Sequence, residues 1–99
     1  MRNTYCEISL PIIKNNLKII QDFCGTKKVC AVIKADAYGH SIVPVAKALA
    51  EQGVDYVAVA IVEEGKKIRE AGIMTPILLL AGIEAYEIDD CIKYDLTIT

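Results

Sequence analysis

The residues most suited to chemistry in this sequence lie in the stretch AVIKADAYGHS, positions 31 to 41. Lys34 ends a run of apolar residues, and an amine beside a buried strand is partly removed from water. Loss of hydration disfavours the ammonium form and lowers the pKa, which suits a lysine that forms a Schiff base with a carbonyl compound. The alternative is a lysine whose amine simply reaches water at a strand end. On position alone, this second interpretation is favoured.

The residues after Lys34 also allow two interpretations each. The Tyr38 hydroxyl could donate to a phosphate, although in general a buried aromatic plug for the loop is the favoured interpretation. Gly39 marks a backbone position that a side chain would obstruct. His40 taken alone is more often a structural histidine than an acid or base. Ser41 is expected to cap a helix whose N-terminus could also favour a nearby phosphate.

This motif lies in a pattern of alternating strands and helices. Strands are expected at 29–33, 56–61, 77–80 and 96–98, and helices at about 10–24, 41–52, 63–71 and 84–94. Glycines 25, 53 and 72 are expected to end the first three helices. The runs VCAVI, YVAVAI and ILLL are continuously apolar, which is typical of parallel strands buried on both faces. The pattern therefore predicts an α/β fold with right-handed crossovers.

The number of strands indicates an incomplete unit. Four parallel strands leave two unpaired edges, and no helix follows the last strand before Thr99. The pattern fits better as the first parallel βα units of a (β/α)8 TIM-like barrel, which needs about 250 residues. In such folds chemistry collects at the carboxyl ends of the strands, where Lys34 is expected.

Composition argues against several other classes of protein. The net charge of −2 comes from mixed acids and bases without a basic stripe, so nucleic-acid binding has no electrostatic footprint. The longest apolar run, 56–62, is too short to span a bilayer, and the N-terminus lacks the apolar core of a signal peptide, so a cytoplasmic location is expected. Cysteines 6, 24, 30 and 91 show no CxxC spacing; we expect reduced thiols that act as small apolar fillers, and no metal site.

Taken together, these residues resemble the bacterial alanine racemases, pyridoxal-phosphate enzymes with a TIM-like barrel and a separate C-terminal β domain. The stretch KADAYGH is similar to their cofactor-lysine motif. TYCEISL resembles their opening segment, VDYVAVAIVEEGKKIREAGIMTPILLLAG their second and third barrel units, and YDLTIT the start of their fourth strand. The likeness covers essentially the whole chain but only the first part of the family's length. Pro11 and Ser41 depart from the family's usual aspartate and glycine.

The resemblance implies roles for individual residues. Lys34 would be the Schiff-base lysine that holds pyridoxal 5'-phosphate, and one of two bases that act on opposite faces of the alanine α-carbon. The Tyr38 hydroxyl would bind the cofactor phosphate. Val32 and Leu80 would point from neighbouring strands and pack on the cofactor ring, and His40 would only support the loop. The cofactor would act as the electron sink for the carbanion.

The resemblance also implies what lies outside these residues. The family's second base is a tyrosine from the C-terminal domain of the partner subunit, and an arginine facing the pyridine nitrogen comes from a later strand. Residues 1–99 would then be the N-terminal part of the barrel domain, without the C-terminal β domain. The complete homodimer would supply D-alanine for peptidoglycan, and this chain alone would be inactive.

Other functions remain open on the sequence. A basic amino-acid decarboxylase of the same barrel superfamily also places a lysine after its first strand, but its motif usually lacks the Tyr-Gly-His turn. A non-catalytic pyridoxal-phosphate-binding protein uses a related single barrel, and TYCEISL disfavours it. A gene fragment without function is the third alternative.

Overall fold

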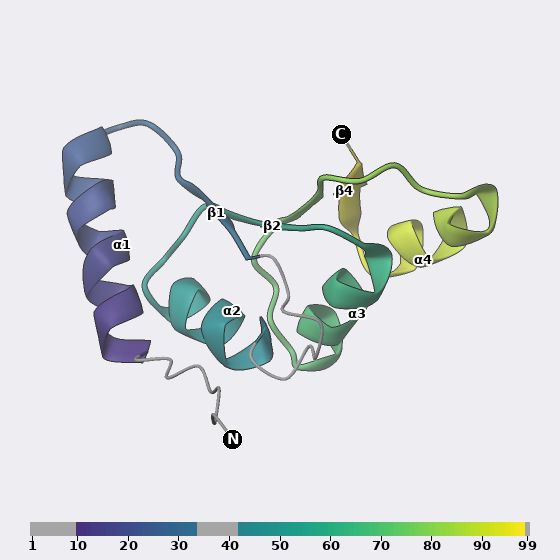
Figure 1. The fold of residues 1–99 in the computed structure, drawn as a ribbon, viewed down its shortest axis with the longest axis horizontal. Helices are drawn as coiled ribbons and strands as arrows, with labels where there is room; N and C mark the ends of the chain where they lie inside the picture. Colours follow the sequence, from purple (N-terminus) through teal and green to yellow (C-terminus); the bar gives the residue numbers. More distant parts are fainter. Residues whose placement is uncertain (1–9, 34–41, 99) are drawn as a thin grey trace, which may run out of the picture.

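The computed structural model describes residues 10–33 and 42–98 of the chain. The elements in order are α1 (Leu10–Cys24), β1 (Cys30–Val32), α2 (Ile42–Glu51), β2 (Tyr56–Val59), α3 (Val62–Glu70), β3 (Ile77–Leu79), the 3-10 helix η1 (Ala85–Glu87), α4 (Ile88–Lys93) and β4 (Leu96–Ile98) (Figure 1). The strands form one parallel sheet in the order β1-β2-β3-β4. The predicted α/β fold of consecutive parallel βα units is therefore confirmed.

The helix ends follow the predicted glycines. Gly25, Gly53 and Gly72 have φ of 63°, 82° and 85°, a left-handed conformation that glycine adopts without steric cost. The predicted fourth helix corresponds to η1 and α4, which follow one another without a break over 85–93, although its first turn is a 3-10 turn and not α-helical. None of the helices within 10–33 and 42–98 is both long and apolar enough to cross a membrane.

The core lies between the sheet and its helices. In neighbouring parallel strands, residues in register point to the same face, and the register joins Val57 to Ile77 and Val59 to Leu79. All four side chains are fully buried, as are Ala46 of α2 and Ile68 of α3. These residues belong to one hydrophobic cluster, so α2 and α3 cover this face. We call it the helix face.

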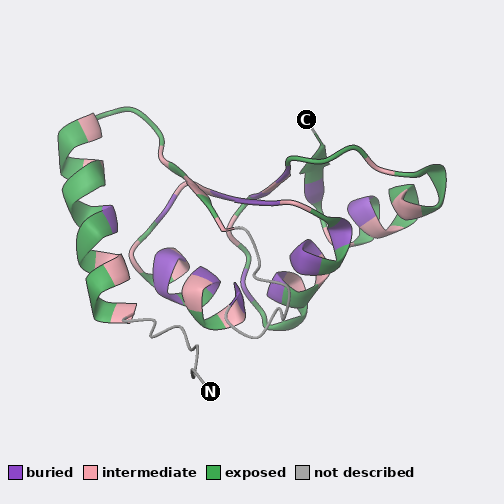
Figure 2. Cartoon of the chain, in the orientation of Figure 1, coloured by how far each residue is buried: buried purple, intermediate pink, exposed green. Residues whose placement is uncertain are grey.

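The opposite face of the sheet is unevenly covered: Figure 2 shows much of β2 in the colour of buried residues, whereas other residues of this face are exposed. Cys30, Val32, Leu80 and Thr97 are exposed and alternate with the residues of the helix face. The prediction that both faces are buried therefore holds for β2, where Ala58 on this second face is fully buried, but it is wrong for β1 and β4. The strands carry apolar residues on both faces of the sheet. The described helices α2 and α3 pack on the helix face only. We call this second face the open face.

Arg69 connects α3 to the entries of β3 and β4. Its guanidinium donates to the carbonyl oxygens of Tyr94 at 2.7 Å, Ile73 at 2.9 Å, Thr75 at 2.7 Å and Asp95 at 3.2 Å. Burial lowers the pKa of Arg69, and the nearby carboxylate of Asp95 opposes this shift. One side chain thus fixes two loops at the amino ends of the strands.

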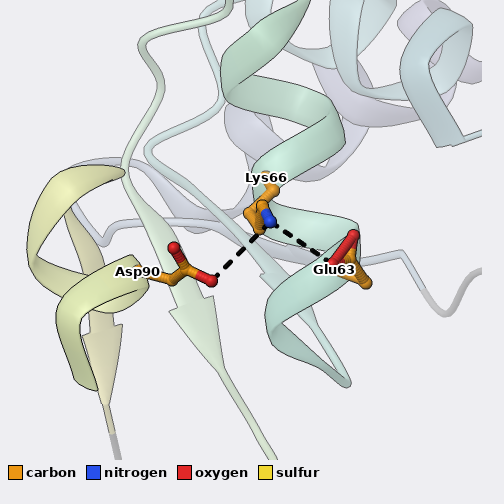
Figure 3. A network of polar contacts seen from close by, with 3 residues as sticks. All are labelled: Glu63, Lys66 and Asp90. Carbon is orange, nitrogen blue, oxygen red and sulfur yellow. Dashed lines mark hydrogen bonds and ion pairs between the residues drawn. The ribbon is translucent and has the colours of Figure 1, made fainter. Parts of the chain in front are cut away.

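A polar network and a close packing contact join α3 to the last βα unit. Lys66 Nζ lies 3.6 Å from Asp90 Oδ2 of α4 and 3.4 Å from Glu63 Oε1 of its own helix (Figure 3). Asp90 contributes most to raising the pKa of Lys66, followed by Glu63. Beside this network, a methyl group built on Gly65 would lie 2.8 Å from Leu96 Cδ2, so α3 approaches β4 closely at the glycine.

Candidate functional site

The expected site is at the carboxyl ends of β1, β2 and β3. The parallel ladder continues past the strand bounds there, because the Ile33 N–H donates to the Ala58 carbonyl and the Leu80 N–H to the Val59 carbonyl, both at 2.9 Å. The backbone is therefore ordered by the sheet up to the residue before Lys34. Lys34 itself, with Tyr38, His40 and Ser41, lies outside the described residues, and their roles remain predictions.

Val32 and Leu80 lie on the open face near this edge. They are 55% and 45% exposed, which leaves both side chains able to contact a ligand. Val32 is in register with Ala58, and Ala58 with Leu78, two residues before Leu80. The prediction that they come from neighbouring strands is wrong, since β2 lies between β1 and β3. Two strand spacings separate them laterally by about 9–10 Å.

Glu64 also shapes this edge and was not identified from the sequence. Its carboxylate Oε1 accepts hydrogen bonds from the backbone N–H groups of Ala60 at 2.8 Å and Ile61 at 3.1 Å. The residue is buried, and it is the third residue of α3, so it fixes the loop that leaves β2. This also explains why β2 ends at Val59 rather than at Ile61 as predicted. The available signal was a glutamate at the third helical position, the spacing of a capping box.

The described cysteines are free thiols in three different environments. Cys91 is buried and Cys24 is partly buried, but Cys30 is exposed on the open face beside Val32. The prediction of apolar fillers therefore fails for Cys30. Burial raises the pKa of Cys91, as do Glu87 and Asp90, and partial desolvation raises that of Cys30. Within 10–33 and 42–98, no group of three or more His, Cys, Asp or Glu residues could hold a metal ion.

Comparison with known proteins decides the family. The family model for the alanine racemase N-terminal domain matches residues 8–99. This chain belongs to the alanine racemase family. Alanine racemase 1 of Oceanobacillus iheyensis is 39% identical over 99 residues, which are 99% of this chain and 26% of that protein. The alanine racemase of Halothermothrix orenii is 43% identical over 96 residues, 96% of this chain and 25% of that protein.

Solved alanine racemases share the fold. The Bacillus anthracis enzyme, solved with bound L-Ala-P, superposes with a TM-score of 0.86 at 38% identity, over 100% of this chain and 26% of that one. The Clostridium difficile 630 enzyme gives a TM-score of 0.79 at 44% identity, over 87% of this chain and 23% of that one. The chain therefore spans about a quarter of the length of the racemases that it matches. Both the predicted resemblance and the predicted N-terminal part of the barrel are confirmed.

Proposed function

We propose that this chain is the cofactor-lysine portion of a pyridoxal-phosphate-dependent alanine racemase. One observation carries the proposal: the family match runs through KADAYGH, and this motif begins directly after the ordered end of β1. The carboxyl ends of parallel barrel strands are where catalytic groups of such folds collect. The complete enzyme would interconvert L- and D-alanine in the cytoplasm and supply D-alanine for peptidoglycan.

The described residues fit the proposed cofactor. Val32 and Leu80 present exposed apolar surface near the carboxyl edge, and a flat aromatic ring is a suitable partner for such surface. When bound, pyridoxal phosphate supplies an electron sink for the carbanion that racemisation requires. Lys34 would hold the cofactor, and the Tyr38 hydroxyl would donate a hydrogen bond to the phosphate.

Lys34 would also move the substrate proton. Racemisation removes the α-proton from one face of alanine and returns a proton to the other, so two bases are needed if the substrate stays in place. The Lys34 amine would serve one face, and the second base would come from the C-terminal β domain of the partner subunit in a homodimer. Residues 1–99 hold only part of the barrel domain under this proposal, and they would not catalyse the reaction alone.

Cofactor binding by the purified chain tests the cofactor part of the proposal. The chain is incubated with pyridoxal phosphate, reduced with borohydride and mapped by mass spectrometry. A single adduct on Lys34, lost in Lys34→Ala and kept in the matched surface variant Lys28→Ala, is the expected result. No adduct, or labelling scattered over many lysines, would contradict formation of the half-site by this chain.

Two further measurements test the remaining roles. Val32→Asp and Leu80→Asp should each weaken cofactor binding about tenfold if the side chains pack on the ring, the magnitude expected for losing one apolar contact. Thr97→Asp on the same face should leave binding unchanged. Interconversion of L- and D-alanine should be absent; a rate proportional to the concentration of the chain would refute the proposed dependence on a second domain.

A further inference from the structure

The Glu64 carboxylate does more than cap α3. In a capping box, the glutamate at the third helical position accepts a hydrogen bond from the backbone N–H of the N-cap residue, which here is Ile61. The same Oε1 atom also accepts the Ala60 N–H at 2.8 Å, and this is the shorter of the two bonds. Ala60 precedes the N-cap and lies directly after the last residue of β2. Helix capping therefore explains only one of the two bonds.

The Ala60 N–H would otherwise continue the pairing of β2 with β1. Along a parallel strand, alternate residues pair with the same neighbouring strand at even intervals. The Tyr56 N–H donates to the Val29 carbonyl, so four residues further along both strands the Ala60 N–H would donate to the Ile33 carbonyl. This N–H donates to Glu64 instead. Glu64 thus takes the donor that would extend the sheet beyond Ile33.

A single peptide group links Glu64 to Leu80. The Val59 carbonyl accepts the Leu80 N–H at 2.9 Å, and Val59 and Ala60 share this peptide bond. Because the peptide group is planar, the direction of its N–H fixes the direction of its carbonyl. When Glu64 holds the Ala60 N–H, it therefore also holds the acceptor to which the end of β3 is bonded. Successive hydrogen bonds of this kind polarise and strengthen one another.

The Glu64 side chain is itself held firmly. It is 8% exposed, and Val62 and Ile68 of the same helix belong to the hydrophobic cluster of the helix face. The first turn of a helix favours a negative charge, because the helix dipole is positive there. A buried carboxylate is costly unless it is hydrogen bonded, so Glu64 keeps its two backbone donors rather than turning to water. The carboxylate is thus a fixed point for the end of β2.

We propose that Glu64 is a positioning residue for Leu80: through the Val59–Ala60 peptide group, it fixes the place at which the Leu80 side chain meets the cofactor ring. The inference rests on the proposed function, in which Leu80 packs on pyridoxal phosphate. Glu64 acts on the backbone and touches neither cofactor nor substrate. Its removal loosens the end of β3 at the site, and small displacements of this kind weaken the contacts of a bound group.

Hydrogen exchange of single amides tests the link without any cofactor. Glu64→Met keeps a side chain of similar length but removes the acceptor, whereas Glu64→Gln keeps an oxygen that can accept the Ala60 N–H. The exchange rate of the Leu80 amide is divided by that of the Tyr56 amide, which donates at the other end of β2. This ratio should rise about tenfold in Glu64→Met, as expected for loss of one hydrogen bond, and stay near its original value in Glu64→Gln. Equal ratios in all three chains would overturn the link.

Arg69→Met separates positioning from a general loss of stability. This variant removes hydrogen bonds at the amino ends of the strands, far along α3 from Glu64. It should not raise the ratio of Leu80 to Tyr56 exchange. A rise as large as that in Glu64→Met would show that any destabilisation loosens the carboxyl edge, and it would overturn a specific role for Glu64.

A double-mutant cycle tests whether Glu64 acts on the cofactor through Leu80. Dissociation constants for pyridoxal phosphate are measured from the absorbance of the bound cofactor. Leu80→Ala and Glu64→Met should each weaken binding about tenfold, and the double variant should bind about as weakly as either single variant, because the second change finds the contact already lost. Glu64→Gln should bind like the unchanged chain. Independent effects, about a hundredfold together, would overturn the proposal.

The two measurements also distinguish the inference from the proposed function. If the unchanged chain binds no pyridoxal phosphate, the proposed cofactor chemistry fails for this chain. The exchange ratio then still decides whether Glu64 positions Leu80, since it needs no cofactor. Conversely, binding that is equal in the unchanged chain and in Glu64→Met would support the proposed function and overturn the positioning role.

Discussion

Replacing Arg69 with methionine should destabilise the fold more than any other single change on the exposed side of α3. The substitution keeps the apolar stem and removes the donors to four carbonyl oxygens, those of Ile73, Thr75, Tyr94 and Asp95. These carbonyls belong to two separate loops, so their loss uncouples the entries of β3 and β4. The effect is therefore on the sheet and not on the helix alone.

The magnitude follows from the geometry. Hydrogen bonds to a charged group contribute about 1.5–3 kcal/mol each. The four contributions are not additive, because Arg69 is partly exposed and water can donate to some of the carbonyl oxygens once the guanidinium is removed. We therefore expect Arg69→Met to reduce the free energy of unfolding by about 2–4 kcal/mol. Arg69→Lys should recover part of this loss, because a single ammonium keeps the charge but cannot present the planar fork of donors.

Urea denaturation followed by circular dichroism measures the change, with all variants at one protein concentration. Lys67→Met on the same helix is the control, since Lys67 is exposed and its replacement should change the free energy of unfolding by less than about 0.5 kcal/mol. If Arg69→Met and Lys67→Met unfold at the same midpoint, the four hydrogen bonds do not stabilise the chain and the reasoning is wrong.

Three further outcomes are expected. Gly65→Ala should lower the free energy of unfolding by about 1–2 kcal/mol, because overpacking against Leu96 exceeds the gain in helix propensity, and adding Leu96→Val should restore most of it. Glu64→Ala should cost about 1–3 kcal/mol in the same urea assay, since it leaves the Ala60 and Ile61 N–H groups without their acceptor, and an unchanged midpoint would exclude this role. Cys91 should resist alkylation in the native chain and react once urea unfolds it, because it is buried and its raised pKa keeps the thiol protonated. Mass spectrometry measures the labelling, and fast alkylation of the native chain at neutral pH would contradict this packing.

Most of the fold was predictable because the signals that specify it are local. The three helix-ending glycines have the expected left-handed φ, and the four strands lie within the predicted ranges. The 3-10 first turn of the fourth helical stretch was not predicted; within it the Glu84 N–H donates to the Glu87 carboxylate. Strand lengths depended on partners: β2 stops two residues early because Glu64 binds the next two backbone N–H groups.

The candidate site was only partly predictable. KADAYGH identified the family from sequence, and the family resemblance, not the strand pattern, implied Val32 and Leu80 as contacts of the cofactor ring. Their separation by β2 required the strand order. Glu64 was missed because one carboxylate among thirteen acidic residues has no distinguishing composition; only its burial and its two backbone donors reveal its role.

The sequence by itself determined the order of the βα units, the helix ends and the family, because each depends on residues close together along the chain. The tertiary structure alone decided which apolar face the helices cover and which side chains meet across loops. Arg69 reaches carbonyls up to 26 positions away, and Gly65 meets Leu96, so neither contact has a periodic or local signature.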